Sequence, residues 1–272
     1  MPRTRAYRVA YDGRPFHGFQ RQPDVPTVED AVFDALRALG ALADDAAKPD
    51  GYAAAGRTDA GVSARAQTVA FEAPEWLTPR ALNGELPGSI RAWASADVPA
   101  GFHATHDAAS REYRYHLYAP RDGELDATRV RDALDRLAGE RDFHNLTPDD
   151  DGTVRDLTAD AERGGDFLRL RFEAGGFARQ LVRRLVGLAA AIGRGDAPLG
   201  KVDRALDSEP LDGPEGVAPA PAYPLVLWDV EYPGVAFSVD EDAVESARDV
   251  FGARCAELTT RGRVAGSIRD SL

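Results

Sequence analysis

Hydrophobic positions repeat at two spacings along this chain, and the change from one spacing to the other predicts a mixed fold. In residues 5–11 every second side chain is apolar on one face, which is typical of a strand. From Thr27 to Gly40 the spacing becomes three and four residues, which predicts an amphipathic helix with Thr27 as its N-cap. The apolar stripe of this helix is Val28, Val32, Phe33, Leu36 and Leu39.

The same two spacings divide the rest of the chain. Further strands are predicted near residues 66–72, 89–97, 111–118, 154–162, 167–173 and 225–231, and further helices near 78–86, 128–138, 178–193 and 199–207. Residues 51–65 are small and Gly-rich, which indicates a strand that enters a tight loop. Residues 208–221 are predicted to be an exposed loop, and the tail from Asp240 to begin as a helix and then fray.

Helices alternate with strands in both halves of the chain, and the order of elements is similar in each. This order predicts an α+β architecture of two similar lobes whose sheets share an edge or abut, with the junction near residues 104–110. No repeat is visible at the level of single residues.

Composition limits the classes of protein that need to be considered. Hydrophobic residues make up 43% and charged residues 29% of the 272 residues, which is ordinary for a folded globular protein. No stretch approaches the roughly 20 apolar residues that span a bilayer, and no apolar signal segment opens the chain, so we expect a cytoplasmic protein. A single cysteine, Cys255, excludes an intrachain disulfide and a cysteine-built zinc site.

The charge balance is unusual. The net charge is −12, yet 33 residues are basic, and Lys48 and Lys201 are the only lysines among them. A surface rich in acidic residues and poor in lysine suits a cytosol at high salt, although a merely acidic protein is the plainer alternative. A negative total disfavours a nucleic-acid partner unless the arginines gather in one cleft.

The segment from Gly56 to Val62, GRTDAGV, is the most informative part of the chain. Its two glycines permit a tight turn and let a bulky ligand approach the backbone, and Asp59 lies at its centre. A carboxylate placed there can act as a nucleophile if a guanidinium such as that of Arg57 keeps it ionised. The alternative is that Asp59 caps the turn by bonding its own backbone.

The run AAGRTDAGVSARAQTVAF resembles the active-site loop of TruA-type tRNA pseudouridine synthases, and other segments resemble that family in the same order. They are YDGRPFHGFQRQ, LNGELPGSIRAW, FHA with SREYRYHLY, GGFARQLVRRLVG and APAPAYPLVLWDVEYP, which together extend from Tyr11 to Tyr232. Ser63, Thr105 and Leu181 depart from the family's usual residues. The chain resembles an archaeal, halophilic member of the family.

The resemblance implies a site of three residues. Asp59 matches the catalytic aspartate, a nucleophile toward either the ribose or the base of the target uridine. Tyr113 matches the first tyrosine of the RxYxY strand, which is expected to pack on a flipped uracil and to act as or assist a general base. Arg183 matches the arginine of the V-R helix and would pair with Asp59. Without the resemblance, Tyr113 and Tyr115 would both be expected in the core.

Four further residues are candidates for substrate binding, namely Gln20, Arg21, Gln22 and Arg57; loop bracing is the alternative for Arg57, and capping of a strand end for the two glutamines. The fold implied is two RRM-like lobes with antiparallel sheets, residues 1–107 and 108–272, meeting at a central cleft. The implied activity converts uridine to pseudouridine at positions 38–40 of the tRNA anticodon stem-loop, by a homodimer without metal or organic cofactor.

Two other functions remain open at this point. A non-enzymatic RNA-binding protein would keep an arginine-lined cleft without needing the acid. A metal-dependent hydrolase would need a cluster of ligands, for which His103, His106 and the adjacent Asp107 are the one close histidine group in the sequence.

Overall fold

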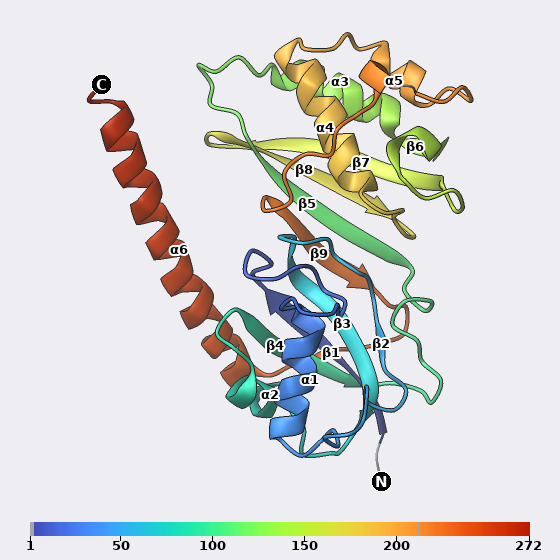
Figure 1. Ribbon diagram of the computed structural model, residues 1–272, viewed down its shortest axis with the longest axis vertical. Helices are drawn as coiled ribbons and strands as arrows, with labels where there is room; N and C mark the ends of the chain where they lie inside the picture. The colour runs from blue at the N-terminus through green and yellow to red at the C-terminus, as the bar shows by residue number, and fades with distance from the viewer. Residues whose placement is uncertain (1–2, 212) are drawn as a thin grey trace.

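Ten strands form one sheet that runs through the length of the molecule (Figure 1). The computed structural model describes residues 3–211 and 213–272. Along the sheet the order is β10-β4-β1-β3-β9-β5-β8-β7-β6, with β2 paired to β3. The strands are β1 (Arg3–Tyr11), β2 (Ala53–Ala54), β3 (Ser63–Ala73), β4 (Ile90–Asp97), β5 (Ser110–Tyr118), β6 (Gly139–Asp142), β7 (Val154–Gly164), β8 (Phe167–Ala174), β9 (Leu225–Glu231) and β10 (Ser238–Val239).

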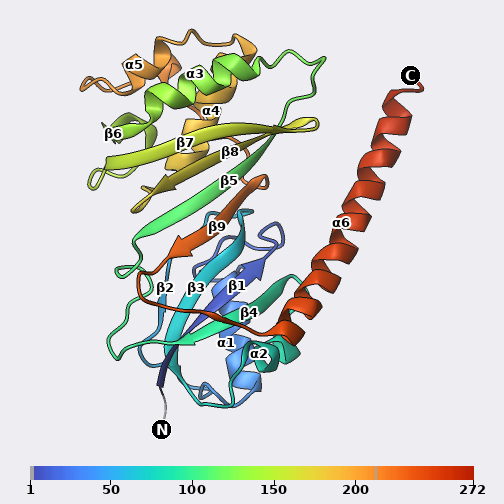
Figure 2. The ribbon, with the colours of Figure 1, turned by 180° about the vertical axis from the view of Figure 1, so that it is seen from behind.

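Five helices lie on one face of this sheet, and the view from behind shows the strands in front of them (Figure 2). They are α1 (Val28–Ala38), α2 (Pro79–Glu85), α3 (Ala127–Leu137), α4 (Leu181–Arg194) and α5 (Lys201–Ala205). Side-chain caps fix where three of them begin, because Thr27, Thr78 and Asp126 each accept a hydrogen bond from a backbone N–H of the first turn. None of the described helices is long and apolar enough to cross a membrane.

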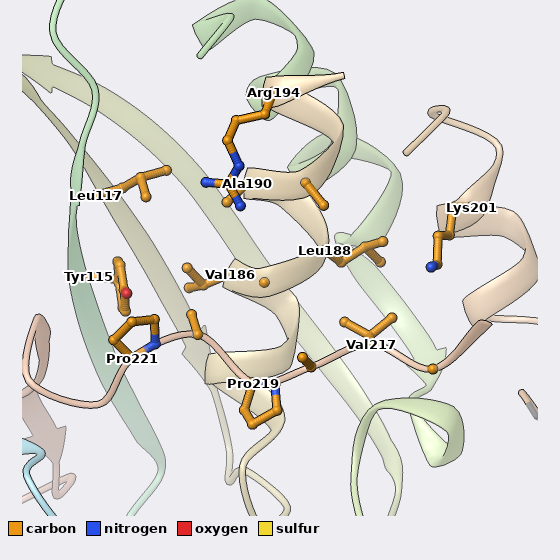
Figure 3. A pocket seen from close by; sticks show the side chains of 15 residues that line it. Tyr115, Leu117, Val186, Leu188, Ala190, Arg194, Lys201, Val217, Pro219 and Pro221 are labelled. Carbon is orange, nitrogen blue, oxygen red and sulfur yellow. The ribbon is translucent and has the colours of Figure 1, made fainter. Parts of the chain in front are cut away.

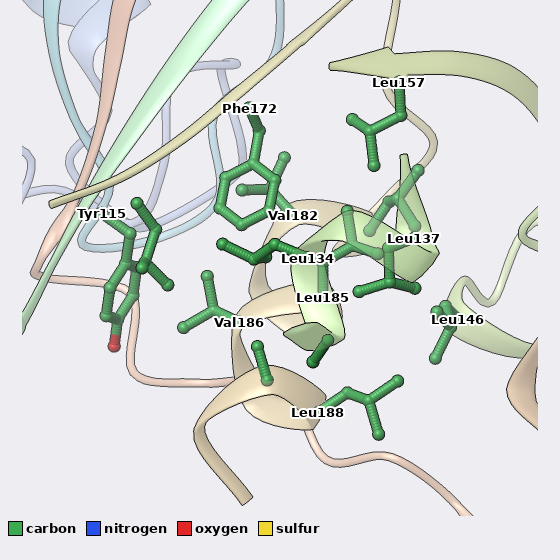
Figure 4. Close-up of a cluster of buried hydrophobic side chains, with 14 of the residues drawn as sticks. Tyr115, Leu134, Leu137, Leu146, Leu157, Phe172, Val182, Leu185, Val186 and Leu188 are labelled. Carbon is green, nitrogen blue, oxygen red and sulfur yellow. The ribbon is translucent and has the colours of Figure 1, made fainter. Parts of the chain in front are cut away.

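Each lobe has its own hydrophobic core between helices and sheet. In the first lobe, α1 and α2 cover β1, β3 and β4, and Tyr7, Phe33 and Phe71 are fully enclosed. In the second lobe, α3 and α4 cover β5 and β8 around Leu134, Leu185 and Phe172 (Figure 4). Because each lobe buries its own apolar core, each lobe is stabilised separately within the one chain.

The two lobes join where β9 lies between β3 and β5. β9 pairs parallel with β3 over a short stretch and antiparallel with β5, so Leu227 is the partner of both Ala64 and Tyr113. Because neighbouring strands lie about 5 Å apart, this row brings the start of β3 close to the middle of β5. The loop that ends at β3 therefore sits directly at the junction of the lobes.

The α+β class and the two-lobed arrangement are confirmed, with one refinement: the two sheets are a single continuous sheet. Several boundaries were wrong. β3 begins at Ser63 rather than near 66, and α4 begins at Leu181 rather than near 178, because Gln180 has the left-handed φ of 60°. The short strands β2, β6 and β10 were predicted only in part or not at all.

The predictions for the tail and for segment 208–221 have different outcomes. The tail does not fray after its start, since α6 (Glu241–Arg269) is one helix of 29 residues. The described part of segment 208–221 is mostly exposed, as predicted, except that Val217 is buried and its carbonyl accepts a hydrogen bond from Arg184 Nη1 at 2.6 Å. Asp212 lies outside the described residues.

The last residues of the chain return to the first lobe. β10 pairs with β4, and Arg80 of α2 contacts Asp242 at the start of α6. From there α6 extends away from the sheet (Figures 1 and 2), and Ala243 is its one buried residue.

Candidate active site

The loop from Gly56 to Val62 lies between β2 and β3 and is tied down along its length. The amide of Val62 donates to the carbonyl of Asp59 at 3.1 Å, which closes a turn. Gly61 in this turn has a φ of 80°, a conformation that residues with a side chain rarely adopt. The backbone thus fixes where Asp59 points.

Buried side chains of the first lobe hold the loop from below. The hydroxyls of Tyr11 and Thr58 lie 2.7 Å apart in a buried hydrogen bond, and Gln67 Nε2 donates to the carbonyl of Gly56 at 2.8 Å. The amide of Phe19 donates to the carbonyl of Thr58 at 3.0 Å. These bonds hold Gly56 and Thr58, which flank Arg57, in place. Thr58 also directly precedes Asp59.

Arg183, in the first turn of α4, reaches across from the second lobe to Asp59. Its Nη1 lies 3.0 Å from Asp59 Oδ2, and its Nε donates to the carbonyl of Ala220 at 2.8 Å. The side chain of Arg183 is 17% exposed and that of Asp59 is 30% exposed. The pair is thus partly screened from water, and the charge-assisted contact fixes the direction of the carboxylate. No described backbone N–H donates to the Asp59 carboxylate, so the turn-capping alternative finds no support.

Tyr113 completes the group of three. It lies on β5, packs against both hydrophobic cores, and meets Phe177 edge-on with ring centroids 5.2 Å apart. Burial, with a contribution from the charge of Asp59 that opposes that of Arg111, raises the pKa of Tyr113 to about 12. The phenol is therefore protonated at neutral pH, which suits stacking and hydrogen bonding better than proton removal.

Arg111, two residues before Tyr113 on the same face of β5, was not singled out from the sequence. Its buried guanidinium donates to the carbonyls of Ala55 at 3.0 Å, Gly175 at 2.6 Å and Thr105 at 2.5 Å. One side chain thus joins the entrance of the Asp59 loop, the link between the lobes and the turn before Phe177. The sequence signal that could have identified Arg111 is its place as the first residue of the RxYxY strand.

The residues predicted to bind substrate are placed differently from one another. Arg57 and Gln20 are exposed, and neither side chain bonds to another described residue. Gln22 Nε2 donates to the carbonyl of His17 at 2.8 Å. The Arg21 guanidinium is bonded to Asp30 at 2.6 Å and to the carbonyl of Ala47 at 2.8 Å, so it braces the loop that follows β1.

The histidine pair forms a local turn. The rings of His103 and His106 lie tilted at 34° with centroids 4.2 Å apart, Nδ1 of His103 accepts from the amide of Thr105, and Asp107 accepts from the amide of His103. Within residues 3–211 and 213–272 no group of three or more His, Cys, Asp or Glu is placed to hold a metal ion.

A partly buried carboxylate–guanidinium pair beside a tyrosine, in a junction between two α+β lobes, defines a candidate covalent-catalysis site. Comparison with known proteins gives the class. Residues 133–233 match the family model described as tRNA pseudouridine synthase. The protein named tRNA pseudouridine synthase A of Haloarcula marismortui is 61% identical over 98% of this chain and 100% of its own length.

Its counterpart in Natronomonas pharaonis, of the same name, is also 61% identical, over 97% of this chain and 98% of its own length. Among solved structures, an H/ACA RNP bound to a substrate RNA containing 2'-deoxyuridine aligns loosely, with a TM-score of 0.35 and 16% identity over 69% of this chain and 53% of that chain. The chain belongs to the tRNA pseudouridine synthase family, whose members are isomerases, and the resemblance read from the sequence is confirmed. Both named relatives come from halophilic archaea, in agreement with the acidic, lysine-poor composition.

Proposed function

We propose that this protein converts uridine to pseudouridine in the anticodon stem-loop of tRNA, at positions 38–40, with Asp59 as the nucleophile. Membership of the family supports the reaction and the kind of substrate. The observation that carries the assignment of residues is the contact of 3.0 Å between Asp59 and Arg183, with Tyr113 close to Asp59.

The reaction explains why these groups are needed. The bond from C1′ of the ribose to N1 of uracil breaks, a bond from C1′ to C5 forms, C5 loses its proton, and N1 ends with one. No electrons are gained or lost overall, so the chemistry needs a transient partner for the separated fragment rather than a redox group. The ionised carboxylate of Asp59 fills that role by bonding either to C1′ or to the base and then leaving.

The other two residues position the reactants. Arg183 fixes the direction of the carboxylate, since its own Nε is anchored on Ala220. The ring of Tyr113 offers a flat face for a uracil that has been turned out of its helix. Its raised pKa, about 12, favours a protonated phenol that stacks on the base.

We assign binding of the RNA to the junction of the lobes, where Asp59 meets Arg183. Arg57 is exposed beside Asp59 and free to contact a phosphate, and we retain Gln20 and Gln22 as contacts of the same kind. Arg21 is proposed in a lesser role, because its guanidinium is already bonded within the protein. We further propose a cytoplasmic homodimer, with residues 1–107 carrying the nucleophile and residues 108–272 carrying Tyr113 and Arg183.

Tritium release tests this function. Unmodified tRNA transcripts labelled with tritium at C5 of uridine should release label to water when wild-type protein is added at high salt, and chemical mapping should place pseudouridine at positions 38–40. Release without modification at 38–40 would overturn the assignment of positions. No release from any transcript would overturn the activity itself.

A further inference from the structure

A groove crosses the outer face of α4 immediately beside the candidate active site (Figure 3). It has a volume of about 350 Å³, and its walls are β5, α4 and the segment 216–221. This volume lies in the range of about 300–1,000 Å³ that is usual for sites of small ligands. None of the residues proposed above as catalytic lines it.

The hydrogen bonds of Arg183 and Arg184 position one wall of the groove. The segment 216–221 is anchored on α4 by Arg183 Nε to the carbonyl of Ala220 and by Arg184 Nη1 to the carbonyl of Val217. It approaches the helix closely at Gly187, where a Cβ would lie 2.3 Å from the carbonyl oxygen of Ala218. One wall of the groove is therefore a direct continuation of the active site.

A tyrosine hydroxyl that makes no hydrogen bond within the described residues faces the groove. Tyr115 is 3% exposed, and its hydroxyl makes no hydrogen bond to any residue within the described ranges, although the groove reaches it. In Figure 4 the hydroxyl of Tyr115 points away from the cluster of buried side chains. Burial raises the pKa of Tyr115 to about 12, so the hydroxyl is a donor at neutral pH. Because this hydroxyl opens into the groove, it is available to donate a hydrogen bond to a bound ligand.

The charge of the lining is opposite to that of the whole protein. The chain carries a net charge of −12, yet no Asp or Glu lines the groove, whereas Arg194 and Lys201 do. Arg194 also has a contact with Asp196 and remains 45% exposed. The prolines Pro219 and Pro221 add apolar, flat surfaces at the opposite edge of the lining (Figure 3). The lining therefore fits a ligand with both an anionic group and a flat ring.

The groove lies at the right place for a neighbour of the target base. Tyr115 is two residues beyond Tyr113 on the same face of β5, which corresponds to roughly 7 Å along the strand. Successive nucleotides of an extended strand are separated by a step of that order. A strand that delivers one base to Tyr113 and Asp59 would thus bring an adjacent nucleotide to this groove.

We propose that the groove binds a nucleotide that flanks the target uridine in the same RNA strand, with its base against Tyr115 and the prolines and its phosphate near Arg194. This proposal rests on the proposed function, because the RNA must already be held at Asp59. RNA-binding proteins commonly recognise unstacked bases by packing and hydrogen bonding of this kind. The groove thereby acts as a second contact that selects RNA in which a neighbour of the target can also leave the stack.

The test combines protein variants with RNA variants. Tyr115→Phe removes only the hydroxyl, and Arg194→Ala removes only the cation. Each should raise KM for a tRNA anticodon-arm RNA about tenfold while kcat stays within about twofold. Tyr118→Phe, on the same strand but 57% exposed, and Arg136→Ala, an exposed arginine paired with Asp203, are matched controls that should leave KM unchanged.

An RNA with an abasic site at one flank of the target then identifies the contact. For the wild-type protein, the abasic site at the 5′ or the 3′ neighbour should raise KM as much as Tyr115→Phe does. In the Tyr115→Phe protein, the same abasic site should add no further loss, since both changes remove one interaction. Unchanged KM in both protein variants, or losses that simply add at both flanks, would overturn the proposal. If the wild-type protein forms no pseudouridine, the proposed function fails first and this site with it.

Discussion

The two lobes hold their parts of the site by different means. In the first lobe Asp59 lies on a loop without regular structure, held by single hydrogen bonds such as those of Thr58 and Gly56. In the second lobe Tyr113 and Arg183 lie on a paired strand and on a helix whose apolar face is buried. The difference teaches that damage to the loop should lower the activity of the folded protein, whereas damage to the second core should lower stability and leave activity nearly unchanged.

The largest effect is expected where the lobes meet. Arg183→Met removes the cation that pairs with Asp59 and orients it, and it leaves a partly buried carboxylate without a partner. Turnover should fall at least about 100-fold, the usual cost of losing exact placement in a catalytic group. Single-turnover pseudouridine formation measures this.

Arg179, four residues before Arg183, supplies the control for that experiment. Arg179→Met changes a side chain that is 61% exposed and paired with Asp149 outside the site, so turnover should stay near the wild-type rate. Equal losses in both variants would mean that positive charge around the start of α4 matters, rather than the pairing of Arg183 with Asp59.

The second core gives the opposite kind of result. Leu134 of α3 is fully buried between α4 and the sheet, and Leu134→Ala should lower the free energy of unfolding by about 2–5 kcal/mol through lost burial and a cavity. Below its unfolding transition the variant should keep kcat within a few-fold. Urea titration and kinetics on one sample measure both, and Leu134→Met serves as the volume-conserving control. A large loss of kcat with intact stability would contradict the comparison.

In the loop of the first lobe, the loss of a single hydroxyl should be enough to lower kcat. Tyr11→Phe removes one hydroxyl and leaves that of Thr58 buried without its partner, which should cost about 1–3 kcal/mol of stability. Because Thr58 precedes Asp59 directly, kcat should nevertheless fall about tenfold. Tyr7→Phe is the matched control: it removes a buried hydroxyl bonded to the carbonyl of Leu77, far along the chain from the loop. If both variants lose kcat equally, the loop has no special sensitivity.

The smallest effect concerns pH. The folded-state pKa of Tyr113, about 12, lies above the usual 10 of an unfolded chain, so folding favours the protonated phenol. The stability contributed by this group is full below pH 10 and is lost as pH rises from 10 toward 12. Wild-type protein should therefore lose stability with pH in this range more steeply than Tyr113→Phe, by up to about 1.4 kcal/mol per pH unit. Identical slopes would contradict the burial of this phenol.

The sequence predicted most of the local structure, because local structure depends on neighbouring residues. Thr27 and the apolar stripe after it specify α1, and the alternation of Leu168, Leu170 and Phe172 specifies β8. The start of α4 was misplaced because nothing in the side chain of Gln180 signals a left-handed backbone. The continuity of α6 was missed because its residues carry few packing contacts that a pattern could reveal.

The site was predictable only in part. Resemblance to a family singled out Asp59, Tyr113 and Arg183, but periodicity alone would have placed Tyr113 in the core. Pairing of β9 with β3 joins residues more than 160 positions apart, which no local pattern encodes. The same limit hid Arg111, whose bonds to Ala55, Thr105 and Gly175 depend on three distant segments meeting.

The most direct measurement of the central claim separates binding from turnover in Asp59→Asn. Asparagine has the shape of aspartate and can still bond to Arg183, but it lacks the anionic oxygen needed to form and release a covalent bond. The account predicts that the dissociation constant for tRNA stays within a few-fold of the wild-type value while no pseudouridine forms. Pseudouridine formation by Asp59→Asn at a rate near that of the wild-type protein would contradict it.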